Sequence, residues 1–184
     1  MGICPVKAVF LDRDGVLNVM YFTDGIPRPP DGLRELVIYP EVPEALRRLK
    51  AAGYLLLVVT NQPDVARGVT NMEQVNEIHA VMRATLPLDD FFICPHDNVH
   101  KCECRKPRPG MVLEAAARYK VDLSQSFMVG DRWRDMACGS AAGVRTVLID
   151  RGYKEQSPVK APDYVADGLG AAAEWILGQT ETRP

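Results

Sequence analysis

Short apolar runs recur at wide intervals along this chain of 184 residues, and helical patterns fill the intervals between them. The runs are continuous rather than alternating, which is typical of strands buried on both faces of a parallel sheet. They span residues 8–11, 54–59, 91–93, 127–129 and 146–149. The helical patterns span residues 43–52, 72–86, 111–119, 133–142 and 169–177. This alternation predicts a doubly wound, Rossmann-like α/β fold with a parallel sheet.

Composition limits the number of domains and the kind of partner. A hydrophobic content of 47% over 184 residues fits one domain better than two, so we expect a single domain over residues 1–184. The formal net charge of −2, with no block of Lys and Arg, argues against a protein that binds nucleic acid or a membrane surface. No apolar run approaches the roughly 20 residues that span a bilayer, and the first residues lack the pattern of a secretion signal. We therefore expect a cytoplasmic protein, and we expect it to be a monomer.

The segment from Tyr21 to Pro40 interrupts the alternation of strands and helices. Its prolines and glycines exclude a long regular element. Long loops are often functional, so this segment could lie beside a substrate, but it could equally be a passive connector.

Polar side chains follow four of the predicted strands at the point where each strand ends. Because the carboxyl ends of parallel strands share one edge of the sheet, we expect these side chains to meet there. Each of them alone could simply cap the following helix, but together they predict a polar site. Two carboxylates about 4 Å apart repel by roughly 4 kcal/mol in a partly buried site, so adjacent aspartates indicate a cation, a shared proton or strong solvation. The residues are Asp12 and Asp14, Thr60 to Gln62, Asp131, and Asp150.

Three of the five cysteines crowd one short segment together with a histidine. Cys94, His96, Cys102 and Cys104 supply three thiols and an imidazole, a complete tetrahedral ligand set for zinc. The alternatives are reduced thiols beside a surface histidine, or a disulfide, and the absence of a secretion signal favours zinc. Four protein ligands leave no open coordination position, so we expect a short loop that binds structural Zn²⁺. His100 is a second candidate for the imidazole.

Four motifs follow one another along the chain: Asp12-Arg13-Asp14-Gly15, then Thr60-Asn61, then Lys106 in Arg105-Lys106-Pro107, and finally Gly130-Asp131 with Asp135. In type and order they resemble the four motifs of the haloacid dehalogenase superfamily of phosphohydrolases. The resemblance covers residues 6–153. It implies a haloacid dehalogenase-like fold. The interval between Asp14 and Thr60 holds too little regular sequence for a separate cap domain, so we expect an open active site shaped by loops.

The resemblance also implies roles for the motif residues. Asp12 would attack phosphorus and form an aspartyl-phosphate, and Asp14 would act as general acid and then general base, with a pKa raised by its neighbours. Thr60 and Lys106 would hold the phosphoryl oxygens. Mg²⁺ would be bound by the carboxylates of Asp12 and Asp131 and by the backbone carbonyl of Asp14. Asp135 would orient Lys106 or the metal shell.

The cysteine and histidine pattern runs directly into Arg105-Lys106-Pro107, and this narrows the resemblance to the branch of histidinol-phosphate and heptose bisphosphate phosphatases. The match through Thr60-Asn61-Gln62 and Pro109-Gly110-Met111 is closer to the heptose bisphosphate enzymes. The implied substrate is a small sugar phosphate, and histidinol phosphate is the alternative. Asn61, Gln62, Arg105 and Arg132 are the candidates for substrate binding. Pro63-Asp64 departs from the family pattern, which carries Ser-Gly there, and this change affects the expected specificity.

A phospho-accepting receiver domain is a competing class of protein. Receivers also pair a strand-end aspartate with magnesium on a doubly wound sheet. Asp14 favours an enzyme, because a carboxylate placed as acid and base promotes turnover, whereas a receiver benefits from a long-lived acyl phosphate.

Overall fold

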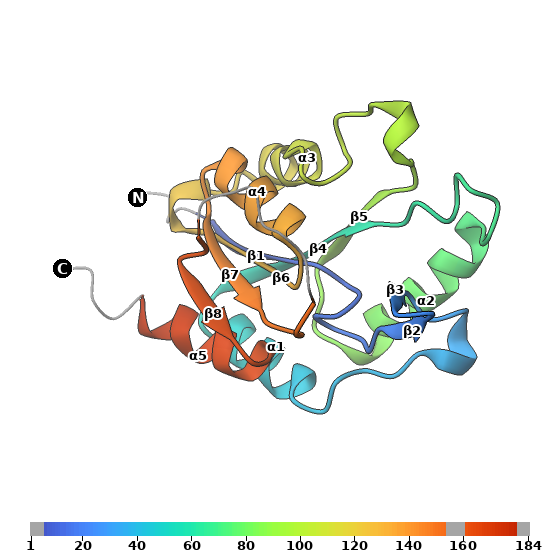
Figure 1. The fold of residues 1–184 in the computed structure, drawn as a ribbon. Helices are drawn as coiled ribbons and strands as arrows, with labels where there is room; N and C mark the ends of the chain where they lie inside the picture. Colours follow the sequence, from blue (N-terminus) through green and yellow to red (C-terminus); the bar gives the residue numbers. More distant parts are fainter. Residues whose placement is uncertain (1–5, 154–160, 180–184) are drawn as a thin grey trace.

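The computed structural model describes residues 6–153 and 161–179, and it places six strands in one sheet with helices on both faces (Figure 1). Every neighbouring pair of strands is parallel, so the predicted doubly wound α/β fold is confirmed. Five of the strands lie on the predicted apolar runs, while the last was not predicted because it has three residues and one of them is exposed. In sheet order the strands are β5 (Asp90–Cys94), β4 (Tyr54–Asn61), β1 (Lys7–Leu11), β6 (Phe127–Gly130), β7 (Arg145–Ile149) and β8 (Tyr164–Ala166).

Two layers of helices cover the sheet. Successive side chains of a strand point to opposite faces, so Val9 and Leu11 pack on one side and Ala8 and Phe10 on the other. The first side is covered by α1 (Val42–Ala51), α2 (Met72–Thr85) and α5 (Leu169–Gly178), and the second by α3 (Gly110–Tyr119) and α4 (Trp133–Ala142). All five helices match the predicted helical patterns to within one residue at each end.

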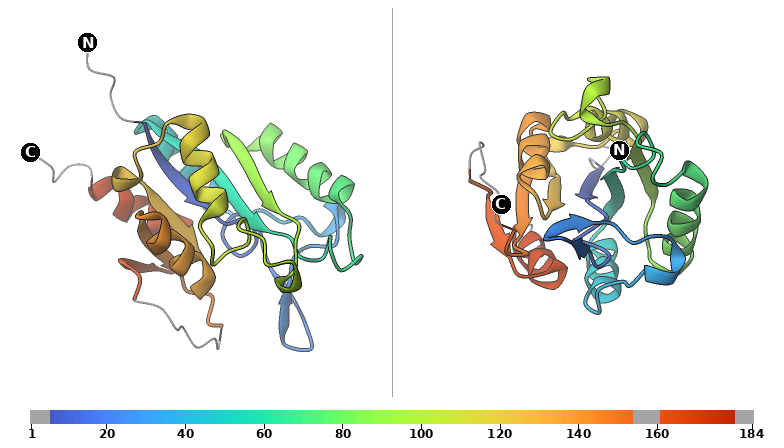
Figure 2. Two further views of the ribbon diagram at one scale, coloured as in Figure 1. Left: turned by 90° about the horizontal axis from the view of Figure 1, so that it is seen from above. Right: turned by 45° about the vertical axis from the view of Figure 1, so that its right-hand side comes forward.

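The segment from Tyr21 to Pro40 forms a short hairpin of β2 (Tyr21–Thr23) and β3 (Ile26–Arg28), followed by a 3-10 turn at Leu33–Glu35. No long element occurs in this segment, as predicted, but the hairpin itself was not predicted. Figure 2 shows the hairpin projecting at the end of the sheet where the strand-end loops gather. Residues 14–60, all of them described, contain no separate cap domain.

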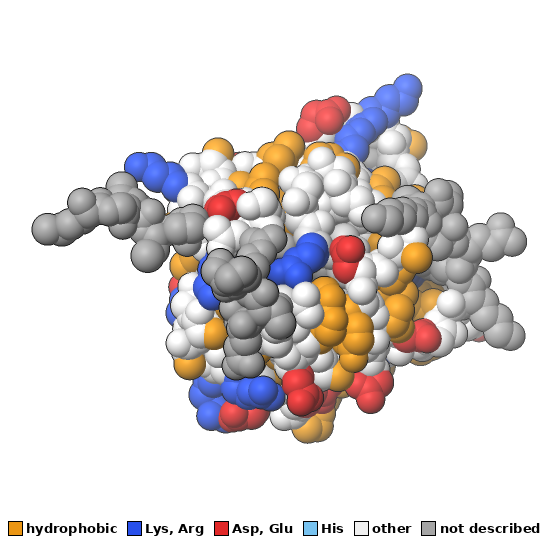
Figure 3. Space-filling model, turned by 90° about the vertical axis from the view of Figure 1, so that its left-hand side faces the viewer, with side chains coloured by type: hydrophobic (Ala, Val, Ile, Leu, Met, Phe, Trp, Pro, Cys, Tyr) orange, Lys and Arg blue, Asp and Glu red, His pale blue; other side chains and the backbone are white. Residues whose placement is uncertain are grey.

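The surface carries charges of both signs. On the face seen in Figure 3, acidic and basic side chains are interspersed, and neither sign forms a continuous field there. Within residues 6–153 and 161–179, no helix is long and apolar enough to cross a bilayer. The single domain over residues 1–184 stays a prediction.

Candidate active site and metal-binding loop

The motif residues meet because β1 lies between β4 and β6 in the sheet. Leu11 at the end of β1 is in register with Val58 on one side and Val129 on the other, so the loops that follow these strands leave the sheet together. Gly15 allows a close approach: its φ is +82°, and a side chain there would place its first carbon 1.9 Å from Asp131 Oδ2. The loop after β1 can therefore lie directly against Asp131.

Lys106 is buried at the centre of this site. Its Nζ lies 2.9 Å from Asp12 Oδ1 and 2.7 Å from Asp135 Oδ1, and it donates to the carbonyl of Val59 at 2.8 Å. Asn61 holds the backbone of Lys106 through two hydrogen bonds of 3.1 Å. Burial alone would lower the pKa of Lys106, but the carboxylates of Asp12 and Asp135 raise it above its usual value. The ammonium therefore stays protonated beside the candidate nucleophile.

Asp12, Asp131 and Asp135 form a carboxylate cluster in which one oxygen of each lies within 4.8 Å of the others. Both oxygens of Asp131 are buried and lack a hydrogen-bond partner of good geometry among the described residues. Burial, followed by the charges of Asp12 and Asp135, raises the pKa of Asp131 well above its usual value. Burial also raises the pKa of Asp12 to about 7, although Lys106 lowers it. A hard divalent cation that takes oxygen ligands, such as Mg²⁺, fits this cluster because it would neutralise the repulsion.

The pKa of Asp14 differs from the one expected from the sequence. Its carboxylate accepts hydrogen bonds from Arg13 at 2.8 to 3.1 Å, from Asn18 at 3.0 Å and from Gln62 at 2.8 Å. Burial favours a raised pKa, but the Arg13 charge and these hydrogen bonds lower the pKa of Asp14 below its usual value. The expectation of a raised pKa is therefore wrong, because the side chain of Arg13 folds back onto its neighbour in the chain.

The polar residues at the end of β4 contact one another. Thr60 is fully buried, and its Oγ1 accepts a hydrogen bond of 2.9 Å from Gln62 Nε2, which also donates to Asp14. The amides of Asn61 and Gln62 are thus occupied inside the protein, in bonds to Lys106, Thr60 and Asp14. Their contact with a substrate stays a prediction.

A cavity of about 480 Å³ opens over the carboxylate cluster. This volume suits a small ligand. Arg105 and Arg132, the two arginines predicted to bind substrate, line this cavity. Three further arginines that the sequence did not predict line it too, because an isolated arginine has no sequence signature: Arg28, Arg67 and Arg134. Asp64 of the departure Pro63-Asp64 lies at the same cavity. The other polar lining residues are Asp12, Asp14, Asn61, Lys106, Asp131 and Asp135.

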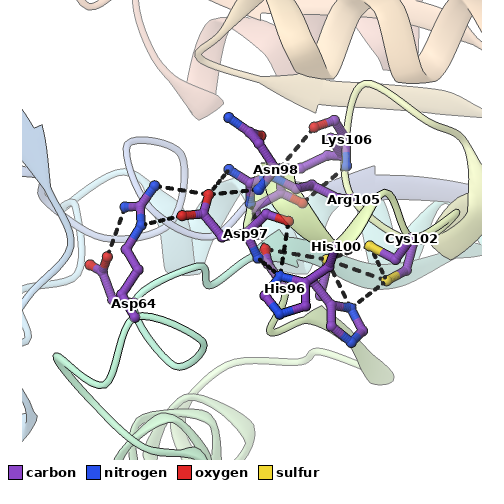
Figure 4. Close-up of polar contacts among 12 residues, drawn as sticks. Asp64, His96, Asp97, Asn98, His100, Cys102, Arg105 and Lys106 are labelled. Atoms are coloured by element: carbon purple, nitrogen blue, oxygen red, sulfur yellow. Dashed lines mark hydrogen bonds and ion pairs between the residues drawn. The ribbon is translucent and has the colours of Figure 1, made fainter.

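The predicted zinc ligands form a second group, the Cys/His cluster of Cys94, His96, Cys102 and Cys104. Figure 4 shows His96 and Cys102 of this cluster. Its thiol sulfurs lie 3.2 to 3.7 Å apart, and His96 Nδ1 lies 3.3 Å from Cys104 Sγ. Ligands around tetrahedral zinc are separated by about 3.5–3.8 Å, so this arrangement can hold such an ion. The three cysteines are free, which does not support the disulfide alternative. His100 lies outside the cluster and caps the turn at Asp97 instead.

The Cys/His cluster is tied to the active site through Arg105 and Arg67. Arg105 follows Cys104 directly, and its side chain donates to the carbonyl of His96 at 3.0 Å and to Asn98 Oδ1 at 2.8 Å. Arg67 pairs with Asp97 at 2.7 Å and with Asp64 at 3.0 Å (Figure 4). The loop that carries the Cys/His cluster and the loop after β4 are thus linked at the mouth of the cavity.

Comparison with known proteins agrees with this geometry. Residues 103–172 match the model of the HAD-hydrolase-like family. The chain is 37% identical to the D-glycero-beta-D-manno-heptose-1,7-bisphosphate 7-phosphatase of Pasteurella multocida, over 94% of this chain and 97% of that protein. It is similar to the crystal structure of D,D-heptose 1,7-bisphosphate phosphatase from B. bronchiseptica complexed with magnesium and phosphate, with a TM-score of 0.81 and 32% identity over 95% of this chain and 99% of that one.

A putative HAD-like phosphatase from Mesorhizobium loti is also similar, with a TM-score of 0.75 and 30% identity over 98% of this chain and 89% of that one. These similarities extend over nearly the whole chain rather than over one motif. The chain therefore belongs to the family of heptose bisphosphate phosphatases within the haloacid dehalogenase-like hydrolases.

Proposed function

We propose that this protein hydrolyses the 7-phosphate of D-glycero-D-manno-heptose 1,7-bisphosphate through an aspartyl-phosphate on Asp12, with Mg²⁺ as the cofactor. Membership of the family makes the protein a phosphoric monoester hydrolase. The observation that carries the mechanism is the convergence of Asp12, Lys106 and Asp131, with both oxygens of Asp131 buried and without a hydrogen bond of good geometry among the described residues. The names of the relatives support the choice of substrate.

The chain's own residues account for transfer of the phosphoryl group. Mg²⁺, held by the carboxylates of Asp12 and Asp131 and by the carbonyl of Asp14, would neutralise charge between the phosphate and the protein. The carboxylate of Asp12 attacks phosphorus, and the electron pair of the breaking bond goes to the leaving oxygen, which takes a proton from Asp14. The Lys106 ammonium and the Thr60 hydroxyl stabilise the phosphoryl oxygens.

Hydrolysis of the aspartyl-phosphate uses Asp14 in the reverse sense. Asp14 takes a proton from the attacking water, the bond from phosphorus to Asp12 breaks, and orthophosphate leaves. The lowered pKa of Asp14 keeps its carboxylate ionised before it accepts this proton. Its earlier role as acid requires a proton, which the negative charge of a substrate phosphate beside it favours.

We propose that the Cys/His cluster binds structural Zn²⁺ through Cys94, His96, Cys102 and Cys104. The ion would fix the backbone that leads from Cys104 into Lys106. Thiols that bind a metal stay reduced in a reducing compartment, so the three cysteines support the cytoplasm as the location of the protein. We also propose that the protein acts as a monomer on a small sugar phosphate, without nucleic acid or membrane as partner, and sedimentation would test the monomer.

A substrate panel tests the proposed function. The purified protein would be assayed for phosphate release from both anomers of the heptose 1,7-bisphosphate, from histidinol phosphate and from hexose mono- and bisphosphates, with and without Mg²⁺. We expect multiple turnovers that require Mg²⁺ and the highest kcat/KM for a heptose bisphosphate. Stoichiometric phosphorylation without turnover would indicate a receiver, and a preference for histidinol phosphate would contradict the proposed substrate.

A further inference from the structure

Arg13 stands between the two aspartates of the first motif, and its side chain is buried, with an exposed fraction of 1%. Its Nε and Nη2 donate to the carboxylate of Asp14 at 2.8 to 3.1 Å, so the planar guanidinium contacts both oxygens. The other terminal nitrogen, Nη1, lies 3.2 Å from Nε2 of His79. Among the described residues, His79 is the only side chain that accepts from Nη1. A buried guanidinium is costly unless it is fully paired, and Asp14 and His79 together supply this pairing.

His79 is held in place by its own packing on α2. Its ring stacks on Phe91 of β5 with the ring centroids 4.5 Å apart, and its exposed fraction is 5%. A guanidinium can only donate, so Nε2 accepts and the imidazole proton is on Nδ1. Burial, and then the charge of Arg13, lowers the pKa of His79 to about 3, which keeps the ring neutral. Nδ1 has no partner within the described chain, so the contact with Arg13 is the polar contact that orients the ring.

We propose that His79 is a positioning residue for proton transfer: it fixes the Arg13 guanidinium, and the guanidinium fixes the carboxylate of Asp14 where it serves the leaving group. The inference rests on the proposed function of this site. Asn18 and Gln62 also bind Asp14, but each supplies one N–H, whereas Arg13 contacts both oxygens in one plane. Loss of the acceptor at His79 would free the guanidinium to rotate and would release Asp14 with it.

Substrates whose leaving groups differ in basicity distinguish this positioning role from a general structural role of His79. When phosphorus bonds to Asp12, the leaving oxygen receives the electron pair of the breaking bond and the proton of Asp14. A sugar alkoxide is strongly basic and needs that proton, whereas p-nitrophenolate leaves without it. Misplacing Asp14 therefore slows transfer from a sugar phosphate and spares transfer from p-nitrophenyl phosphate.

The test compares His79→Leu, which has no acceptor, with His79→Gln, whose side-chain oxygen can replace Nε2. Met82→Leu, on the same buried face of α2, is the matched control. For His79→Leu we expect kcat on D-glycero-D-manno-heptose 1,7-bisphosphate to fall roughly 10- to 100-fold with little change in KM. The single-turnover rate of p-nitrophenolate release should fall less than about 3-fold, and His79→Gln should recover most of the loss.

An equal loss on both substrates, no loss on either, or no recovery in His79→Gln would overturn the inference. If His79→Leu does not fold, Arg13→Lys tests the step from the guanidinium to Asp14, because lysine keeps the charge and loses the planar fork that holds the carboxylate. The same selective loss is then expected, and an equal loss again overturns the inference. A wild-type protein that hydrolyses neither substrate would refute the proposed function instead.

Discussion

Lys106 lies between Asp12 and Asp135, and these two contacts set the charge state of the lysine and of the candidate nucleophile. Burial raises the pKa of Asp12 to about 7 even though the charge of Lys106 lowers it. Without Lys106, the Asp12 carboxylate would therefore be protonated at neutral pH. An ionised nucleophile at neutral pH therefore depends on the lysine and on the proposed cation.

Asp12→Asn should remove turnover and keep the fold. The amide has the shape of the carboxylate but is a far weaker nucleophile, so we expect kcat to fall by at least about 10³-fold. Asp150→Asn is the control, because Asp150 also follows a strand but is exposed, and its carboxylate accepts from the backbone of Gly152 at 2.8 Å. Steady-state phosphate release measures both variants. Activity of Asp12→Asn within tenfold of wild type would contradict the assigned role.

Lys106→Met should destabilise the protein when no divalent cation is present. It removes the charge that faces Asp12 and Asp135, and the free energy of unfolding should fall by about 3–5 kcal/mol. Urea denaturation at neutral pH measures this loss. Lys120→Met, at an exposed helix end, should change the stability by less than about 0.5 kcal/mol. Similar losses for the two variants would show that the buried pairing matters little.

Sequence patterns predicted the residues of the site better than their contacts. Asp12, Lys106 and Asp131 were predicted because strand ends and motif order bring them to one edge of the sheet. The pKa direction of Asp14 was wrong because it depends on the side-chain conformation of Arg13, which no spacing encodes. His79 was missed for the same reason: a lone histidine on an apolar helix face has no signature of its contact with a residue 66 positions away.

Among the elements, the loop that carries the Cys/His cluster is the one whose shape would depend on the proposed ion. The cluster begins at the last residue of β5 and ends just before Lys106, and after β5 the only helical element of this described stretch is a 3-10 turn at Asn98–His100. Such a loop has few backbone hydrogen bonds of its own, so ligand bonds to a metal would supply much of its order.

Cys104→Ser should therefore lose the metal and much of the activity. We expect about one equivalent of zinc per wild-type chain and far less in the variant, with a lower kcat because Lys106 follows the loop. Cys138→Ala is the control, since Cys138 is buried outside the cluster and should leave the metal content unchanged. Elemental analysis and turnover are the measurements. A metal-free wild-type protein with full stability would contradict the zinc assignment.

Helix α2 should make the stability depend on pH through His79. The pKa of this histidine is lowered to about 3 in the folded protein, while the unfolded chain takes up the proton near pH 6.5. Above pH 6.5 both states are neutral there, and below it the unfolded state binds the extra proton, so stability falls as the pH falls. The loss reaches about 2 kcal/mol between pH 6.5 and 5.

Urea midpoints for wild type, His79→Leu and His79→Gln across this pH range test the linkage. Both variants lack the titrating group, so their stability should fall less steeply between pH 6.5 and 5 than that of wild type. Parallel slopes in all three proteins would show that His79 is not buried in its neutral form.

In the whole molecule, the apolar faces of the sheet fix where the site forms. Residues of β1 are buried on both sides, by α1, α2 and α5 on one face and by α3 and α4 on the other, so the polar strand ends can only open at the edge. The cavity forms there, and Ile26, Pro27 and Arg28 of the hairpin of β2 and β3 line it. A small substrate can thus reach the carboxylate cluster in the absence of a cap between residues 14 and 60.

The sequence predicted the long strands and the helices of the fold, but not its short strands. Runs such as residues 54–59 are long and apolar enough to predict buried strands, and the helix bounds followed from periodicity. Strand β8 and the hairpin were missed because each strand has only three residues, and Ile26, Phe22 and Val165 are exposed. Pairing with β7 and the turn at Gly25, rather than an apolar pattern, define these elements.

The central claim is that one divalent ion joins distant carboxylates at the edge of the sheet and leaves Asp12 free to bond to phosphorus. A crystal structure of this protein with Mg²⁺ and beryllofluoride, a mimic of the phosphoryl group, tests it most directly. We predict Mg²⁺ at about 2.0–2.1 Å from oxygens of Asp12 and Asp131, and beryllium bonded to the other oxygen of Asp12 beside Lys106. An ion bound elsewhere, or beryllofluoride bonded to a different residue, would contradict the account.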